Sequence, residues 1–181
     1  MRIIAGQWRG RKLVTPRGDA TSPTADRTRE TLFSMLTSRL GSYEGLHVLD
    51  LFAGSGALGL EALSRGAAQC LFVEQDGEAL RALRANIATL NARNLATVQA
   101  GSVTALGPAR ATADLLLLDP PYGTGAGQVA LDRMLRLGWI GPQSWIALET
   151  AHAERVEVGG LDIETERRAG RAKLTLLRPL T

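Results

Sequence analysis

Short apolar runs alternate with longer amphipathic stretches along most of this chain, and the two patterns predict different elements. Strands are expected at 48–52, 70–73, 97–100, 115–118, 144–148, near Val156 and at 174–177. Between them, apolar side chains recur at helical spacing over 58–64, 78–90 and 129–137. Such alternation predicts an α/β fold with a doubly wound, mostly parallel sheet of seven strands.

Ahead of this alternation, the pattern predicts a hairpin and one further helix. Residues 2–6 and 10–14 are expected to form two short strands, with Trp8 near the tip of the hairpin between them. Residues 22–40 carry apolar side chains at helical spacing, and the pattern stops at Gly41. We therefore expect a helix whose apolar stripe packs on the core.

Positive charge is concentrated in the same part of the chain. Residues 1–45 contain eight Arg or Lys and four acidic residues, a net charge of +4, whereas residues 46–181 contain 13 basic and 14 acidic residues. This asymmetry indicates a polyanionic partner. We therefore expect a basic, RNA-binding extension of residues 1–45, a hairpin plus a helix, ahead of a main domain of residues 46–181.

Seven residues of the extension are candidates for RNA contact. They combine cations suited to a phosphate backbone with a ring suited to base stacking. The candidates are Arg2, Trp8, Arg9, Arg11, Lys12, Arg27 and Arg29. A solvated surface is the alternative, and Arg27 and Arg29 could instead pair with a local acid such as Glu30. For a second basic group, Arg167, Arg168, Arg171 and Lys173, RNA contact and a solvated hairpin are equal alternatives.

Several classes of protein are disfavoured by composition. Cys70 is the only cysteine, so we expect a small apolar strand residue, with no internal disulfide and no thiolate cluster for a metal. The chain has no run of 18 apolar residues, and its first residues lack the apolar segment of a signal peptide. We therefore expect a cytoplasmic protein without membrane association or a metal site, acting as a monomer.

The first strand of the main domain runs into a glycine-rich turn that opens a helix. Gly54, Gly56 and Gly59 match G-x-G-x-x-G, in which glycine allows a tight turn and close approach of a cofactor. Glu74, twenty residues after Gly54, can accept both hydroxyls of a ribose. NAD and S-adenosylmethionine both fit these residues. Asp50 favours S-adenosylmethionine, because a carboxylate suits its cationic methionine end and would repel a pyrophosphate.

The tetrapeptide Asp119-Pro120-Pro121-Tyr122 closes the predicted strand 115–118. Ligands bind at the carboxyl ends of strands in open α/β sheets, and the two prolines force the backbone to turn outward there. Asp119 and the Pro120 carbonyl can accept the two hydrogens of a planar exocyclic amine, while Tyr122 stacks on its face. The motif therefore indicates a nucleobase amine as target. The alternative is a turn whose Asp only caps a helix.

Together these motifs resemble a known family over nearly the whole chain. The glycine turn from Asp50 to Gly59, Glu74 and the DPPY tetrapeptide look like a class I S-adenosylmethionine-dependent amino-methyltransferase. Residues 1–13 and 23–33 closely resemble the RsmD-type 16S rRNA guanine-N2 methyltransferases. The resemblance implies S-adenosylmethionine as cofactor. As partner it implies 16S rRNA, methylated at one guanine within an assembled or nearly assembled 30S particle.

Two positions depart from the family pattern. Ser22 stands where the family usually has Arg before Pro-Thr, which puts one RNA or structural contact in doubt. An acid is common after the third strand, near the adenine amino group, whereas this chain has Gly101, Ser102 and Val103 there. Ser102 either replaces the acid through its hydroxyl or is an ordinary loop serine.

The resulting site has a cofactor side and a catalytic side. The candidate cofactor-binding residues are Asp50, Phe52, Ala53, Gly54, Ser55, Gly56, Gly59, Glu74, Gln75, Ser102 and Val103. The candidate catalytic residues are Asp119, Pro120, Pro121 and Tyr122. We expect direct methyl transfer, without a metal or a covalent enzyme intermediate.

Three other functions are weighed against this one. A DNA adenine-N6 methyltransferase would use the same DPPY chemistry, but an extension of 45 residues is small for reading a sequence in the major groove. An NAD-dependent oxidoreductase leaves the DPPY tetrapeptide and Asp50 without a role. A non-catalytic RNA-binding assembly factor would not need an intact cofactor loop.

Overall fold

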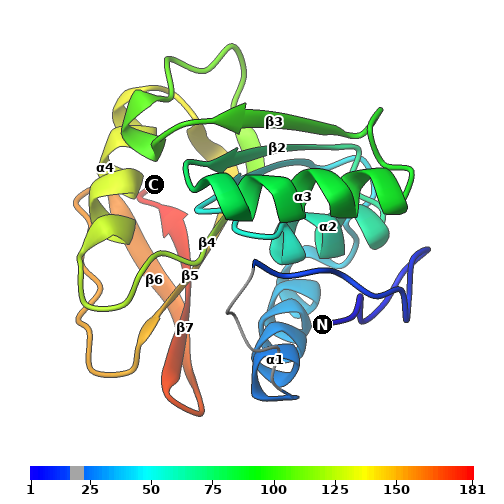
Figure 1. The fold of residues 1–181 in the computed structure, drawn as a ribbon. Helices are drawn as coiled ribbons and strands as arrows, with labels where there is room; N and C mark the ends of the chain where they lie inside the picture. The colour runs from blue at the N-terminus through cyan, green and yellow to red at the C-terminus, as the bar shows by residue number, and fades with distance from the viewer. Residues whose placement is uncertain (17–22) are drawn as a thin grey trace.

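A single sheet forms the centre of the molecule in the computed structural model, which describes residues 1–16 and 23–181 (Figure 1). The strands are β1 (His47–Leu51), β2 (Gln69–Glu74), β3 (Ala96–Ala100), β4 (Ala113–Leu118), β5 (Ile140–Ala151), β6 (Leu161–Ala169) and β7 (Ala172–Pro179). Their order is β3-β2-β1-β4-β5-β7-β6, in which β1 to β5 are parallel and β7 is antiparallel to both of its neighbours. This confirms the predicted doubly wound, mostly parallel sheet of seven strands.

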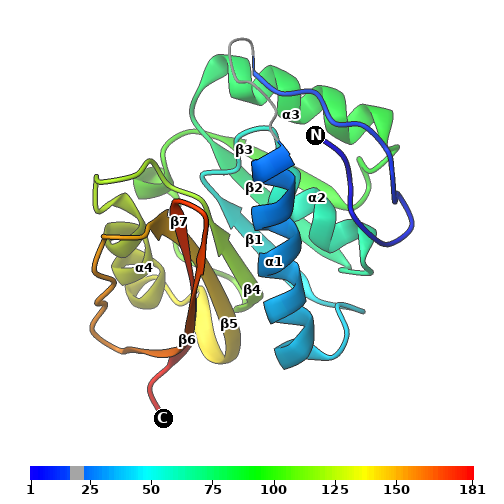
Figure 2. The ribbon, with the colours of Figure 1, turned by 90° about the horizontal axis from the view of Figure 1, so that it is seen from below.

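Helices cover both faces of the sheet (Figures 1 and 2). They are α1 (Pro23–Leu40), α2 (Ala57–Ser64), α3 (Gly77–Thr89) and α4 (Ala126–Arg136), with the short 3-10 helix η1 (Val103–Ala105). The first three helices share an apolar cluster with Phe72 of β2, and α4 packs against Leu116 of β4 on the other face. The parallel strands thus read as apolar runs because both of their faces are buried.

The end of the chain differs from the prediction. Val156 lies outside any strand, and the strand expected there is β6, which begins five residues later at Leu161. Most side chains of β6 are exposed, because it is an edge strand of the sheet. It therefore lacks the apolar run by which the inner strands were recognised. The turn expected at 167–171 is confined to the residues around Gly170.

The predicted N-terminal hairpin is present in short form, as one antiparallel bridge between Arg2 and Lys12 with backbone hydrogen bonds from Ile3 to Arg11 and from Leu13 to Met1, both at 2.9 Å. The segment is also fixed by its contact with the end of α2. The backbone N–H of Gln7 donates to the Ser64 carbonyl at 2.8 Å. A Cβ added to Gly6 would lie 1.9 Å from that carbonyl oxygen, so only glycine permits the approach.

Residues 1–16 and α1 share one apolar core with the main domain. Ile3, Leu13 and Phe33 are buried in the same cluster as Leu60 of α2, as the apolar stripe of α1 predicts. Cys70 is buried in β2 and belongs to this cluster, which confirms its role as a small core residue. The division at residue 45 stays a prediction, with the residues on both sides of it in one core.

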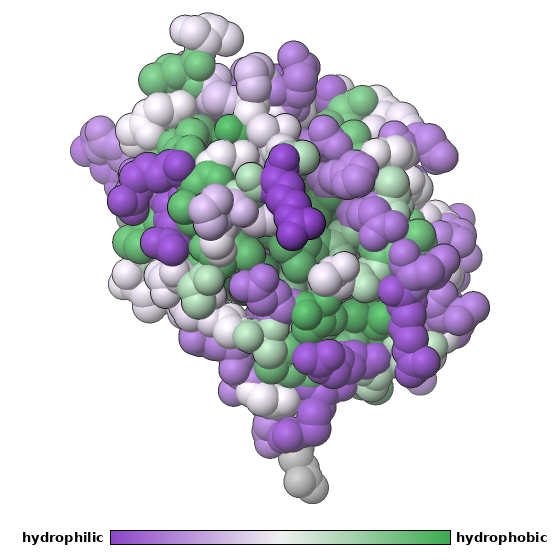
Figure 3. Space-filling view, turned by 90° about the horizontal axis from the view of Figure 1, so that it is seen from above, coloured by the Kyte–Doolittle hydropathy of each residue, from purple (hydrophilic) through white to green (hydrophobic). Residues whose placement is uncertain are grey.

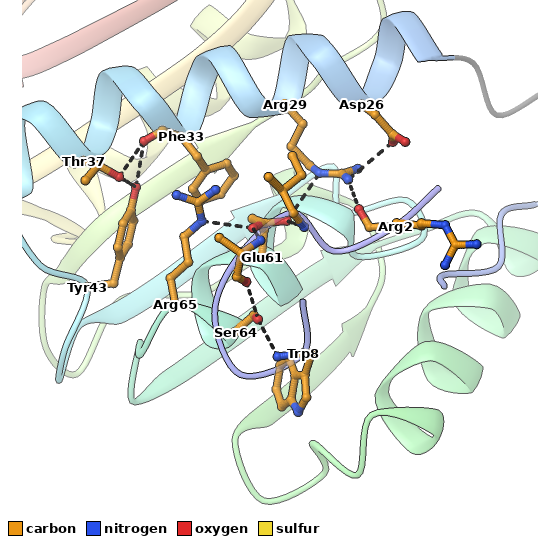
Figure 4. A network of polar contacts seen from close by, with 12 residues as sticks. Arg2, Trp8, Asp26, Arg29, Phe33, Thr37, Tyr43, Glu61, Ser64 and Arg65 are labelled. Atoms are coloured by element: carbon orange, nitrogen blue, oxygen red, sulfur yellow. Dashed lines mark hydrogen bonds and ion pairs between the residues drawn. The ribbon is translucent and has the colours of Figure 1, made fainter. Parts of the chain in front are cut away.

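A buried carboxylate ties the extension to α2 (Figure 4). Glu61 is fully buried, and its oxygens accept hydrogen bonds from the backbone N–H groups of Ile4 at 2.9 Å and Ala5 at 3.0 Å. Arg65 Nε donates to the same carboxylate at 2.9 Å, and Arg29 Nε lies 3.6 Å from it. A buried charge is tolerated only with such partners, so Glu61 acts as the anchor of residues 3–5 and α1.

The surface combines polar side chains with limited apolar exposure. Figure 3 shows hydrophobic atoms near the middle of one face, surrounded by hydrophilic side chains. Within 1–16 and 23–181, the exposed large hydrophobic residues are Val14, Tyr122, Val129, Ile163 and Leu180. No helix in these ranges is long and apolar enough to span a bilayer, and no cluster of at least three His, Cys, Asp or Glu residues there could hold a metal.

Candidate active site

A cavity of about 910 Å³ lies where the carboxyl ends of the parallel strands meet. Its walls come from the turn after β1, the end of β2, the loop after β3, the DPPY segment after β4 and Glu149 of β5. The extension closes one side with Met1, Thr15, Pro16 and Ala25. Pockets of a few hundred to about 1,000 Å³ are the usual size for cofactor and substrate sites. The predicted catalytic and cofactor segments therefore meet in one space.

The glycine turn presents its backbone to this cavity. Phe52 and Gly54 have φ angles of 58° and 57°, and both line the cavity together with Ala53 and Ser55. A Cβ added to Gly54 would have no atom within 4 Å, so the backbone is open to a ligand there. Gly54 also donates its N–H to Glu74 Oε1 at 2.7 Å. The turn is thus held in shape from the end of β2.

The two later glycines serve packing and do not line the cavity. A Cβ on Gly59 would lie 2.4 Å from Phe72 Cε1 and 2.7 Å from Cys70 Sγ, both on β2. A Cβ on Gly56 would lie 2.5 Å from Leu83 Cδ1 of α3. Glycine at these positions therefore lets α2 approach the sheet and α3 closely.

Asp50 lies beneath the glycine turn and not on the cavity wall. Only 1% of its surface is exposed, and Oδ2 accepts the Gly59 N–H at 2.9 Å. Burial raises the pKa of Asp50 well above its usual range, and the hydrogen bond from Gly59 opposes that shift. These contacts correct the predicted direct contact with the methionine end of a cofactor. Asp50 instead orders the start of α2 next to the cavity.

The acid at the end of β2 does line the cavity. Besides Gly54, Glu74 accepts backbone hydrogen bonds from Gln75 at 2.9 Å and Asp76 at 2.8 Å, and all of these residues border the cavity. A carboxylate has about four acceptor positions, so these bonds leave capacity for a ribose hydroxyl. The predicted contacts of Glu74 and Gln75 with a ribose stay predictions.

The loop after β3 contributes Ser102 and Val103 to the wall. The Ser102 hydroxyl caps η1 by accepting the Thr104 N–H at 3.2 Å, and it lies 2.8 Å from the Thr104 hydroxyl. Val103 is buried. Ser102 thus has a structural role in the loop, and its predicted contact with an adenine stays a prediction. Ser22, the other departure from the family pattern, lies outside the described residues.

The DPPY segment leaves the end of β4 and borders the cavity with all four residues. Asp119 is exposed to the cavity, whose walls also restrict its solvation. Desolvation is the larger cause and the negative charge of Glu149 the smaller one, and together they raise the pKa of Asp119 to about 7. At neutral pH the Asp119 carboxyl is therefore protonated in an appreciable share of the molecules.

Glu149 is a site residue that the sequence reasoning missed. It lies near the end of β5, borders the cavity, and accepts a hydrogen bond from the Tyr122 hydroxyl at 2.6 Å. Tyr122 remains 46% exposed, so the bond fixes a ring that is open to the solvent. Desolvation raises the pKa of Tyr122, so the phenol stays protonated at neutral pH. The rule that identified Asp119, an acid at the carboxyl end of a strand, also applies to Glu149.

Two of the predicted RNA contacts are buried. Trp8 is only 9% exposed and packs in the core, with its backbone N–H bound to Ser64 Oγ at 3.0 Å. Arg29 is 5% exposed, pairs with Asp26 at 3.4 Å and Glu61 at 3.6 Å, and donates to the Arg2 carbonyl (Figure 4). The prediction that Trp8 and Arg29 face RNA is therefore wrong. Apolar burial of the ring and ion pairing of the guanidinium explain both residues.

The other cations predicted to contact RNA are exposed, namely Arg2, Arg9, Arg11, Lys12 and Arg27. Arg2 and Arg11 are partly fixed, because Arg2 donates to the Gly10 carbonyl at 2.7 Å and Arg11 donates to the Thr89 carbonyl at 2.9 Å. All five present positive charge to solvent, and their contact with RNA stays a prediction.

The cavity offers groups that fit a nucleoside cofactor. Gly54 offers unobstructed backbone, and Glu74 offers a carboxylate at the end of the neighbouring strand. Phe52 and Val73 add apolar surface to the same wall. A nucleoside cofactor with an apolar ring face and a polar ribose fits this combination of groups.

Comparisons with known proteins show which family this chain resembles. A family model described as Conserved hypothetical protein 95 matches residues 1–178. Ribosomal RNA small subunit methyltransferase D of Escherichia coli (strain K12) is 39% identical over 150 residues, which is 83% of this chain and 74% of that protein. The protein of the same name from Haemophilus influenzae is 36% identical over 154 residues, 83% of this chain and 78% of that protein.

Solved structures of methyltransferases are also similar to this chain. Escherichia coli yhhF matches with a TM-score of 0.85 and 36% identity over 99% of this chain and 97% of that chain. Magnesium protoporphyrin IX methyltransferase from Synechocystis, solved with bound SAM, matches with a TM-score of 0.65 over 89% of this chain and 86% of that chain. At 14% identity, this second likeness shows the fold alone.

Proposed function

The chain belongs to the Conserved hypothetical protein 95 family, and from that premise we propose that it transfers a methyl group from S-adenosylmethionine to N2 of a guanine in 16S rRNA. Its relatives named ribosomal RNA small subunit methyltransferase D support rRNA as the substrate. The observation that carries the proposal is the meeting of the glycine turn, Glu74 and Asp119 to Tyr122 around one cavity. The substrate would be a 30S particle, assembled or nearly so.

The turn from Phe52 to Ser55 and Glu74 would hold the cofactor, with Ser102 and Val103 on the part of the wall next to Glu74. When bound, S-adenosylmethionine supplies an electrophilic methyl group on its sulfonium. Asp50 contributes indirectly, because it holds the Gly59 N–H at the start of α2. Each of these residues belongs to a strand end or helix start, so the cofactor side of the site is built on rigid elements.

On the catalytic side, Asp119 and the Pro120 carbonyl would accept the two hydrogens of the guanine amine. The lone pair of that amine is delocalised into the ring, and two acceptors orient the amine and favour its pyramidal, more nucleophilic form. Tyr122 would stack on the base, a contact worth about 1–3 kcal/mol. Its hydrogen bond to Glu149 holds the ring in place. The Asp119 and Glu149 pair can take up the proton that the methylated amine releases.

A base inside a helical stack could not reach this cavity, so the target would be a loop nucleotide or a flipped one. The same acceptors would suit an adenine N6 amine. The relatives' names favour RNA over DNA, and no feature of the described residues offers a separate unit for reading duplex DNA.

The proposal is tested by incubating the protein with methyl-labelled S-adenosylmethionine and one of three substrates: unmodified 30S particles, protein-free 16S RNA or duplex DNA. We expect label as N2-methylguanosine at one 16S site. Asp119→Ala should abolish transfer while cofactor binding by calorimetry is retained. Asp132→Ala, which removes an exposed acid of α4, is the matched control and should be fully active. Label in DNA adenine, or strong turnover by Asp119→Ala, would refute the proposal.

A further inference from the structure

A basic turn at the tip of the β6–β7 hairpin has no assigned role. Arg167, Arg168 and Arg171 are exposed, and none of them forms an ion pair within the residues that the structure describes. The fourth cation of the hairpin, Lys173, differs because it is partly buried and lies 3.7 Å from Glu166. Three guanidinium groups without an ion pair therefore lie around the end of the hairpin, and Arg168 Nε donates to the Gly170 carbonyl at 3.2 Å. Arg167 and Arg168 belong to the last residues of β6 and Arg171 to the turn itself, and we call this set the arginine turn (Arg167, Arg168 and Arg171).

The sheet places the arginine turn beside the cavity. Strand β7 runs antiparallel to β5, and their last pair joins Ala151 to Ala172. The N–H of His152 donates to the Arg171 carbonyl at 3.0 Å. Glu149 of the cavity wall lies only two residues before Ala151. At about 3.3 Å per strand residue, the backbone of Arg171 is roughly 10 Å along the sheet from this wall.

Helix α1 fixes the other side of the arginine turn. A Cβ added to Gly170 would lie 3.9 Å from Thr24 Cγ2 at the start of α1. The next residue of the helix, Ala25, lines the cavity. Figures 1 and 2 both show the end of the hairpin close to this end of α1. The turn is thus bracketed by two elements that line the cavity, and exposed Arg27 belongs to one of them.

The basic tip of the N-terminal segment, Arg9 to Lys12, lies near the far ends of α2 and α3. The backbone of this segment binds the carbonyl of Ser64, and Arg11 binds the carbonyl of Thr89, the last residues of these two helices. At their other ends, Ala57, which begins α2, and Asp76, which caps α3, line the cavity. With 13 residues, α3 is roughly 20 Å long. Figure 1 shows this N-terminal loop at the right of the molecule, away from the hairpin.

We propose that the arginine turn, with Arg27, is a second RNA-binding element that grips the phosphates flanking the target nucleotide. This inference rests on the proposed function, because it concerns the RNA that presents the base to the cavity. A base turned out of its stack brings its own flanking phosphates to the mouth of the site. Guanidinium groups contact phosphate oxygens with two parallel hydrogen bonds, which fixes position as well as charge. The exposed N-terminal cations would then contact RNA farther from the target nucleotide.

Two triple variants with equal loss of charge separate this element from a general charge effect. The test variant is Arg167→Gln, Arg168→Gln and Arg171→Gln. The matched control is Arg39→Gln, Arg110→Gln and Arg136→Gln, three exposed residues at the ends of α1 and α4 and before β4, on the edge away from the cavity. A third variant with Lys in place of the three arginines of the turn keeps the charge and tests the shape of the group.

The measurements are KM and kcat on unmodified 30S particles and the salt dependence of RNA binding without turnover. The test variant should raise KM on the order of tenfold, with kcat little changed, and should lower the slope of log K against log salt by about two to three, since each lost phosphate contact contributes about 0.7–0.9. The Lys variant should keep the slope and recover only part of the affinity. Unaltered cofactor binding by calorimetry shows that the variants are folded.

A test variant whose KM and salt slope match those of the control variant would overturn the inference and leave the proposed function intact. Absence of methylation by the unchanged protein would instead refute the proposed function. The binding slopes are measured without turnover, so they decide the role of the arginine turn in either case.

Discussion

Methyl transfer should depend on pH across neutrality, because Asp119 is a stronger hydrogen-bond acceptor for the substrate amine when it is ionised. Its pKa is raised to about 7 by desolvation in the cavity and by Glu149. About one tenth of the Asp119 carboxyls would then be ionised at pH 6 and about nine tenths at pH 8, from the ordinary titration of a single group. The ionised fraction rises from about 0.09 to about 0.91, so we expect the single-turnover rate at saturating cofactor to rise about tenfold between these pH values.

Two variants make this prediction specific. Glu149→Gln removes the neighbouring negative charge, so the pKa of Asp119 should fall and the rise in rate should move to lower pH. Asp119→Asn keeps a carbonyl acceptor that does not titrate, so any remaining activity should be nearly independent of pH. A flat profile for the unchanged protein between pH 6 and 8, or the same midpoint in Glu149→Gln, would refute the reasoning.

The contribution of Asp119 to the free energy of unfolding should fall over the pH range in which the rate of methyl transfer rises. A raised pKa means that the folded protein binds the Asp119 proton more tightly than the unfolded chain does. The contribution of this group to stability is therefore greatest at acid pH and is lost as the pH rises toward about 7. Thermal melting measured over a series of pH values, with Asp119→Asn as reference, isolates the contribution of Asp119, since that variant lacks the titrating carboxyl.

The remaining predictions concern buried positions. Glu61→Gln removes the partner of the buried Arg29 and should destabilise the protein by about 3–5 kcal/mol in urea denaturation, and a loss below about 1 kcal/mol would contradict the anchoring role. Gly59→Ala forces a methyl group against Phe72 and should cost about 1–3 kcal/mol or more, whereas Gly107→Ala, with no atom within 4 Å of its Cβ, should be nearly neutral. Equal melting temperatures for the two glycine variants would show that α2 can move away from the sheet.

The parallel part of the fold could be predicted from the sequence because its strands are buried on both faces. Strands β1, β2 and β4 appear as apolar runs, and their observed ends lie within two residues of the expected ones. Strand β6 does not follow this rule. As an edge strand it exposes charged side chains on both faces, and only pairing with β7 makes it a strand.

The site was found where acids directly follow predicted strands, as Glu74 and Asp119 do. Glu149 also directly follows a predicted strand, 144–148, so the same rule applied to that strand would have identified it. The burial of Trp8 and Arg29 in the extension was not predicted for a different reason. Charge counts do not distinguish an exposed guanidinium from Arg29, whose partner Glu61 lies 32 residues away on another helix.

The attachment of the extension through Glu61 also sets an order of events in folding. Ile4 and Glu61 are 57 residues apart, so the early segment has no partner until α2 has been synthesised. A nascent chain that has emerged only as far as α1 would expose Ile3, Leu32 and Phe33, which the complete protein buries. Closing so long a loop carries an entropic cost that local helix formation does not recover. Docking of residues 1–16 should therefore not precede the formation of α2, and we expect a chain interrupted before residue 61 to be a target for chaperones and proteases.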